Sequence, residues 1–287
     1  ATPRDERVKR REQLGLTDAF PIQFGRFVGN AVQGDFGLPY RMSEPVMRVI
    51  GSRLPATIEL SLVAAVIALG LGVGMGVFTG LYPRTAASRA MLTLSLVGVS
   101  LPVFLTGILL ILVFAVWLGV LPSFGRGDVV QLGGWNTGFL TGSGLRAMIL
   151  PAVTLGLFQL TLIMRLVRSE MLEVMRTDYI KFARARGLTN RAINFGHALK
   201  TTLVPVLTIT GLQLGAIIAF SIITETVFSW PGMGQLFIQS VQSVDIPVMA
   251  TYLVLIALFF VVINLVVDLL YYAVDPRLRF DGTKGGH

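Results

Sequence analysis

A basic cluster between two apolar runs holds side chains that could bind a charged partner. Residues 165–200 carry eight Lys or Arg against three acids, and the centre of this segment reads KFARARGLTN (181–190). Guanidinium and ammonium groups bind carboxylates, phosphates and anionic lipid headgroups. The cluster therefore predicts a surface for an anionic partner.

The residues for covalent, metal or nucleotide chemistry are missing from the sequence. The chain has no cysteine and two histidines, His197 and His287, so thiolate chemistry is excluded and no metal cluster is predicted. A G-x-x-x-x-G-K-[ST] phosphate loop is absent, so this chain is not itself an ATPase. We predict no catalytic residue: a TGSG stretch around Ser143 is the one hint of a membrane enzyme, and no apolar run contains a histidine.

The apolar runs that flank this cluster determine the class of protein. Hydrophobic residues make up 53% of the composition and charged residues only 14%, about half the share in a soluble domain. A membrane-spanning helix needs about 20 apolar residues. We therefore predict an all-α integral membrane protein with about five spans, in the charge-free runs Leu60–Pro83, Ala90–Gly125, Met148–Met164, Thr201–Thr224 and Ile246–Val267.

The location of the basic residues predicts which loops are cytoplasmic. Five spans would place Arg84, Arg89, residues 165–200 and the tail on one side, and Arg126 and Arg146 on the other. Cytoplasmic loops carry the excess of Lys and Arg. The bias predicts a cytoplasmic carboxy terminus and explains the net charge of +8 without nucleic acid, because the interleaved aromatic residues that stack bases are absent.

This topology places residues 1–53 outside, although they carry nine basic residues and six acids. We expect a further hydrophobic span upstream of Ala1 to carry them across. Helical spacing predicts a short helix over residues 24–31 that ends at GDFG (34–37), and Ser43 with Pro45 predicts the start of a second. The predicted segments are a 1–53 external cap, a 54–275 transmembrane domain and a 276–287 cytoplasmic tail.

A few polar and small residues within the spans suggest contacts. Asn264 and Asp268 lie four residues apart on one face, which favours a structural pair between Asp268 and an arginine of the internal loop over a proton relay. A glycine stripe in the first span predicts close helix packing, either with another subunit or within this chain: Gly72, Gly76 and Gly80.

Two loops have patterns of their own. Leu172, Met175, Tyr179 and Phe182 share a helical face, Gly187 can end that helix, and Thr189 can cap another, so residues 168–200 predict an amphipathic helix–turn–helix. Such a loop lies on the bilayer or docks a cytoplasmic partner. Residues 224–247 predict an interfacial or re-entrant external element, whereas residues 125–144 predict an irregular loop.

The sequence resembles the permease subunits of peptide-type ABC importers, the dipeptide, oligopeptide, nickel and glutathione group. DYIKFARARGL (178–188) followed by HALKTTLVPV (197–206) is similar to their cytoplasmic loop. The resemblance extends, in order, over REQLGL (11–16), GDFG (34–37), RLPATIEL (53–60), SLP (100–102), GVLPSFGR (119–126), ETVFSWPGMG (225–234), DIP (245–247), NLVVDLLY (264–271) and DPR (275–277).

This resemblance implies a type I ABC importer permease in a bacterial inner membrane. It would pair with a second homologous permease, two subunits that bind ATP and Mg²⁺, and an extracytoplasmic substrate-binding protein. The resemblance implies that a coupling helix inserts into an ATPase groove through Asp178, Tyr179, Ala183, Arg184, Ala185, Gly187 and Leu188. The glutamate of the broader importer loop is absent, since Lys181-Phe182-Ala183 stands there.

The external face would receive the binding protein. We expect contacts from residues 1–53 and from a set in the 225–246 element: Glu225, Trp230, Pro231, Gly232 and Asp245. Trp230 is also typical of an aromatic belt at the membrane surface. The alternative function is a stand-alone ion-coupled carrier or channel, which would need no ATPase.

Overall fold

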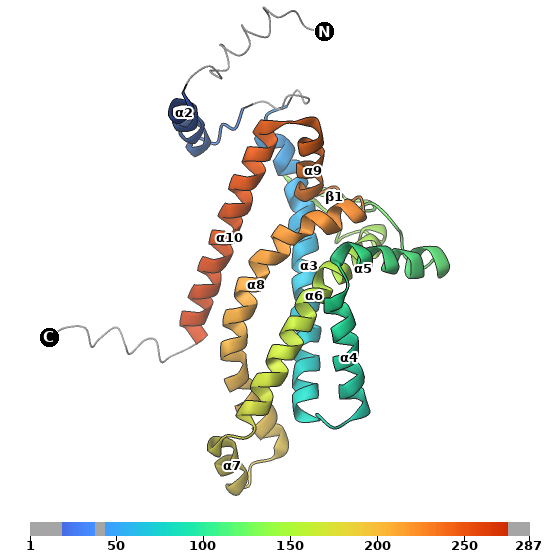
Figure 1. Cartoon of the computed structure of the whole chain (residues 1–287), viewed down its shortest axis with the longest axis vertical. Coiled ribbons are helices and arrows are strands. Elements are labelled where there is room, and N and C mark those ends of the chain that lie inside the picture. Colours follow the sequence, from blue (N-terminus) through green and yellow to red (C-terminus); the bar gives the residue numbers. More distant parts are fainter. Residues whose placement is uncertain (1–18, 38–43, 275–287) are drawn as a thin grey trace, which may run out of the picture.

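The computed structural model describes residues 19–37 and 44–274. Long helices run side by side along the molecule, and α7 lies at one end with α9 and β1 toward the other (Figure 1). The tail 276–287, residues 1–18 and 38–43 of the expected cap (Ser43 among them) and the motifs at 11–16 and 275–277 lie outside the described residues. The helix expected over 24–31 is present as α2 (Phe20–Val32).

The first span is longer than the sequence predicted. Helix α3 (Val46–Leu81) has 36 residues and would extend about 54 Å, well beyond the roughly 30 Å of hydrocarbon. It begins after Pro45, which has no N–H to leave unpaired, and runs without interruption through residue 53. One helix therefore carries residues from both sides of the predicted 53/54 boundary between the external cap and the membrane domain.

Helix α6 (Gly142–Val174) packs along α3 in the same direction. A Cβ atom at Gly76 would lie 2.6 Å from Val167, and one at Gly80 would lie 2.7 Å from Met171. These glycines therefore allow α6 to approach the α3 backbone closely. The glycine stripe serves packing within this chain, which decides between the two predicted uses. Helix α6 also passes Arg165 and Arg168 without a break, so it reaches into the predicted loop.

The second apolar run does not form one straight span. It forms α4 (Ala86–Ser100), α5 (Val103–Leu110) and a π-helical segment η1 (Ile111–Trp117), with a bend of 113° at Leu101–Pro102. Proline lacks the N–H that would continue the helix. Figure 1 shows α5 directed sideways from the other helices. The expectation of an uninterrupted span over residues 90–125 is corrected to a broken one.

The second half of the chain contains two further long helices and three short ones. Helix α7 (Asp178–Ala185) and the π-helical η2 (Ala192–Ala198) lead into α8 (Leu199–Val227). A short helix α9 (Met233–Ser243) packs against α8, α3 and α10 (Ile246–Val274). The external loop, expected to be irregular, contains a hairpin of β1 (Val130–Leu132) and β2 (Trp135–Thr137) that turns at Gly133–Gly134.

The described residues contain three helices long and apolar enough to cross a membrane, α3, α6 and α10. The bent α4–α5 pair makes a fourth if it is counted as one span. Helix α8 is 29 residues long and coincides with the remaining charge-free run; its apolar stretch among the described residues is Gly215–Val227. The chain is therefore a helical, multi-pass membrane protein.

Candidate functional site

Helix α7 presents an apolar surface that the described residues leave uncovered. Phe182 is 63% exposed, and Tyr179 and Leu188 are also exposed, whereas Ile180 and Ala183 are buried against the rest of the chain. The helix follows a break at Arg176–Thr177, so the continuous face expected from Leu172 to Phe182 is wrong. Ala183 is also unavailable for docking in this arrangement, while Ala185 is exposed.

Charges at the two ends of α7 match the helix dipole. Asp178 lies in the first turn and Arg184 in the last, where their charges are favourable. Asp178 Oδ1 forms an ion pair with Lys181 Nζ at 2.8 Å, but both side chains are largely exposed. Exposed pairs of this kind contribute little to stability. These side chains are thus free to exchange this contact for one with a partner.

Gly187 sets the turn after α7, as predicted. Its φ is +78°, in the left-handed region that favours glycine. Gly187 N donates to Arg184 O at 2.9 Å and Leu188 N to Ala183 O at 3.3 Å, which closes the end of the helix. The next helix begins after Thr189, whose Oγ1 accepts from Ala192 N at 3.3 Å, so the predicted cap is confirmed.

The buried face of α7 joins the loop to the long helices. Ile180 and Ala183 belong to one apolar cluster with Met171 and Val174 of α6 and Ile193 of η2. Tyr179 Oη and His197 Nδ1 also form a hydrogen bond between α7 and η2. Since that same cluster continues to Val77 of α3, a displacement of α7 would be transmitted through packed side chains to α3 and α6.

In the amino-terminal half of α3, Glu59 holds the hairpin of β1 and β2. Arg126 Nη2 donates to Glu59 Oε2 and to Asn136 O, both at 2.6 Å, and the ion-paired side chains are only 6% and 2% exposed. Trp135 Nε1 donates to Glu59 Oε1 at 3.1 Å, and Gly138 N to Oε2 at 3.2 Å. A buried carboxylate is tolerated when it is paired and hydrogen-bonded in this way.

Two residues earlier, α3 holds the segment that leads to α9. Thr57 Oγ1 donates to Glu225 Oε1 at 2.6 Å and accepts from Met233 N at 2.8 Å. Gln235 N donates to Glu225 Oε2 at 3.0 Å. Trp230 Nε1 donates to Ala56 O at 2.9 Å. We call the two sets of bonds around Ala56, Thr57 and Glu59 the external joint, after the side on which the sequence predicts this part to lie.

The external joint corrects the predicted docking residues. Glu225 and Trp230 are completely buried, and Asp245 is nearly so. A side chain at Gly232 would collide with the Glu225 carboxylate, so this glycine is needed for packing. Glu225 and Trp230 therefore cannot reach a docking protein here, and Trp230 is not an aromatic-belt residue. The sequence analysis did not predict the Glu59–Arg126 pair. Its only sequence signal was that an acid, Glu59, precedes the apolar run 60–83 and a base, Arg126, follows the run 90–125.

The polar pair predicted on the last span, Asn264 and Asp268, does not include the predicted ion pair among the described residues. Asp268 is exposed and makes no ion pair with another described residue, so the expected arginine partner is absent there. Asn264 Oδ1 is buried without a hydrogen bond among the described residues. The two side chains remain predicted intramembrane polar groups on α10.

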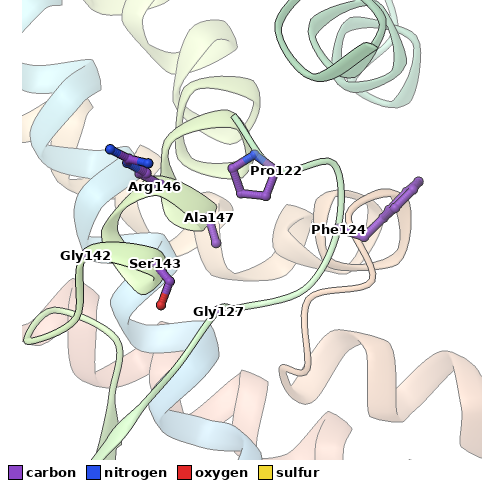
Figure 2. A pocket seen from close by; sticks show the side chains of 7 residues that line it. All are labelled: Pro122, Phe124, Gly127, Gly142, Ser143, Arg146 and Ala147. Atoms are coloured by element: carbon purple, nitrogen blue, oxygen red, sulfur yellow. The ribbon is translucent and has the colours of Figure 1, made fainter. Parts of the chain in front are cut away.

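A pocket of about 500 Å³ lies beside Ser143. Figure 2 shows Ser143 and Ala147 facing the loop of Pro122 and Gly127, with Arg146 and Phe124 at its sides. Ser143 Oγ donates to Asp128 Oδ2 at 2.6 Å and accepts from Asp128 N at 3.1 Å. These bonds close the loop onto α6, which gives Ser143 a structural role.

The long apolar helices define the chain as a multi-pass membrane protein. Residues 72–280 match the family described as the binding-protein-dependent transport system inner membrane component, and the chain belongs to this family.

Two similar curated proteins span most of the sequence. The di/tripeptide transport system permease protein DppB of Pseudomonas aeruginosa is 40% identical over 279 residues, covering 93% of this chain and 83% of that protein. The glutathione transport system permease protein GsiC of Escherichia coli is 37% identical over 270 residues, covering 94% and 83%. The resemblance to permeases of this group is therefore confirmed.

Two solved transporters share the fold. The inward-facing methionine ABC transporter MetNI matches with a TM-score of 0.63 at 22% identity, over 82% of this chain and all of the matched one. An amino acid ABC transporter matches with a TM-score of 0.55 at 15% identity, over 78% and 94%. These likenesses confirm the predicted ABC importer permease fold.

Proposed function

We propose that this chain is one of two permease subunits of an ATP-driven importer for short peptides or a related small solute, such as glutathione or a nickel chelate. The proteins named for dipeptide and glutathione transport, at 36% to 40% identity, support this substrate class. A binding protein would deliver the solute outside. The carboxy terminus and residues 168–200 would face the cytoplasm of a bacterial cell.

Helix α7 would act as the coupling helix. The observation that carries this role is its division into two faces: Phe182, Tyr179 and Leu188 are exposed, while Ile180 and Ala183 join the core that contains α3 and α6. One of the two ATPase subunits would bind the exposed face. ATP would then shift the permease between inward- and outward-facing states, because it favours one state of the subunits that hold α7.

The residues proposed for the contact fall into three groups. Asp178 and Arg184 offer charges at the helix ends, Tyr179 and Leu188 offer apolar surface, and Gly187 fixes the turn. Ala185 is small and exposed, which permits close approach. Ala183 would support the helix from inside. ATP and Mg²⁺ would bind to the ATPase subunits and not to this chain.

The test is to identify what copurifies with the chain in mild detergent. We expect ATPase subunits and a second permease with the wild type, and loss of the ATPases in Phe182→Asp. Phe124→Asp is the matched control, because Phe124 is 62% exposed but lies in the external loop; it should keep the ATPases. A chain that purifies alone in every case would instead support the ion-coupled carrier or channel.

A further inference from the structure

An apolar groove lies between the end of α3 and the start of α8. It has a volume of about 260 Å³ and an almost entirely apolar lining that includes Phe78, Tyr82, Phe195 and Leu199. The Tyr82 and Phe195 rings are 52% and 56% exposed. Figure 1 shows this end of α3 near the segment that follows α7. An exposed apolar groove in a membrane protein requires a cover of matching chemistry.

The floor of the groove is open because of a glycine. A Cβ atom at Gly74 would have no other atom within 4 Å, in contrast to Gly72 and Gly76, which pack against α6. The groove therefore lies on the side of α3 that faces away from α6. It opens at the last turns of the span, where Leu81 ends the helix and Pro83 follows.

The charged residues closest in the sequence to the groove-lining residues Tyr82, Phe195 and Leu199 are basic. Arg84 follows Tyr82, Lys200 follows Leu199, and Arg191 precedes Phe195 by one turn; all three are exposed. None forms an ion pair with another described residue. Residues 60–127 and 179–224, which contain both walls, include no Asp or Glu at all. An apolar slot at a membrane boundary with unpaired cations at its rim fits an acyl chain and an anionic headgroup.

We infer that this groove binds an anionic phospholipid of the cytoplasmic leaflet, with one acyl chain along Gly74 and Phe78 and the headgroup at Arg84 and Lys200. The leaflet rests on the proposed topology. Phe195 and Leu199 follow the coupling loop directly, so a lipid here would fix η2 against α3. It would thereby strengthen the connection between α7 and the spans.

Lipid retention can be measured without assuming transport. The complex as purified, with whatever subunits accompany the full chain, would be titrated with dioleoyl phosphatidylglycerol or dioleoyl phosphatidylcholine and examined by native mass spectrometry. We expect preferential retention of phosphatidylglycerol. A Gly74→Phe variant should lose it. Gly70→Phe is the matched control, because Gly70 is also exposed with no atom near its Cβ and lies one turn earlier, outside the groove.

The rim cations are tested separately. Arg84→Gln with Lys200→Gln should weaken phosphatidylglycerol binding by about tenfold or more and remove the preference over phosphatidylcholine. Arg146→Gln, at the external end, should leave it unchanged. Equal retention by Gly74→Phe and Gly70→Phe would overturn the proposal, as would loss of the lipid when partner subunits are bound, since a protein would then cover the groove. If no ATPase subunits copurified with the chain, the proposed function would be rejected. The lipid-binding measurement could still be interpreted, because it does not require transport.

Discussion

The two ends of α3 and α6 are built in opposite ways. The external joint buries two carboxylates, Glu59 and Glu225, and satisfies them with donors from loops that are far away in the sequence. Helix α7 carries its ion pair on the surface and leaves Phe182 uncovered. The first end is completed by this chain alone, whereas the second offers surface to another molecule. Under the proposed function, the α7 end would transmit a partner's movement, whereas the external joint holds the loops to the spans.

The largest effect should follow from breaking the external joint. Replacement of Arg126 by Met leaves the Glu59 carboxylate buried without its countercharge, which costs about 3–5 kcal/mol. We expect a large fall in thermal stability of the purified chain, measured by fluorescence-detected size exclusion. Adding Glu59→Gln should recover part of the loss, because it removes the stranded charge.

Arg146→Met is the control for that experiment. Arg146 lies on the same side but is exposed and forms no ion pair with another described residue, so its loss should change stability little. Equal destabilisation by both variants would show that the buried pair does not hold the external end.

The next effect concerns the turn after α7. Gly187→Val places a β-branched residue at φ +78°, a conformation that costs about 1–3 kcal/mol. Membrane insertion should remain intact, while substrate uptake per ATP hydrolysed should fall several-fold in proteoliposomes. Gly196→Val tests space alone, since a Cβ there meets nothing and no left-handed φ is required. Normal coupling in Gly187→Val would contradict the turn.

A smaller effect should come from the link between α7 and η2. Tyr179→Phe removes the hydrogen bond to His197 and keeps the ring, for a net loss of about 0.5–1.5 kcal/mol. We expect faster amide hydrogen exchange in residues 178–198 with little change in global stability. Unaltered exchange there would show that apolar packing alone positions the loop.

The smallest effect has the opposite sign and lies at the external end. Val244 ends α9 with a φ of +56° and its side chain is exposed, although β-branched residues disfavour this conformation. Val244→Asn should raise the melting temperature by about 1–3 °C, because Asn tolerates the left-handed region. Val241→Asn, an exposed substitution within α9, should lower it. If both variants were destabilised, the strain at Val244 would be refuted.

The sequence predicted the features that depend on local pattern. Charge-free runs located the spans, and Gly187 and Thr189 marked a turn and a cap whose geometry is confirmed. The end of the charge-free run at Met164 did not mark the end of α6, which continues past Arg165 and Arg168. An apolar run shows which residues suit the membrane, but a helix can continue beyond it. The break at Pro102 was hidden within an unbroken apolar run.

The external joint required information about the fold. Glu59 and Arg126 are 67 positions apart, and Thr57 and Glu225 are 168 apart. No local spacing joins such pairs. Because Glu225 is charged, the sequence suggested that it lies on an external surface. The hydroxyl and backbone N–H groups that donate to its carboxylate come close only when α3, α8 and α9 pack together. Burial reversed the role assigned to Glu225 and Trp230 for this reason.

The difference between the two ends can be tested directly, because the chain has no cysteine. Single cysteines at Phe182 and Phe124, which are equally exposed, would be labelled with an impermeant maleimide in vesicles of each orientation, with and without bound ATPase subunits. We predict that the cysteine at position 182 reacts only from the cytoplasmic side and is protected by the ATPases, and that the one at position 124 reacts only from outside and is not protected. Labelling of both from one side, or an unprotected cysteine at position 182 in the assembled complex, would contradict α7 as the coupling helix.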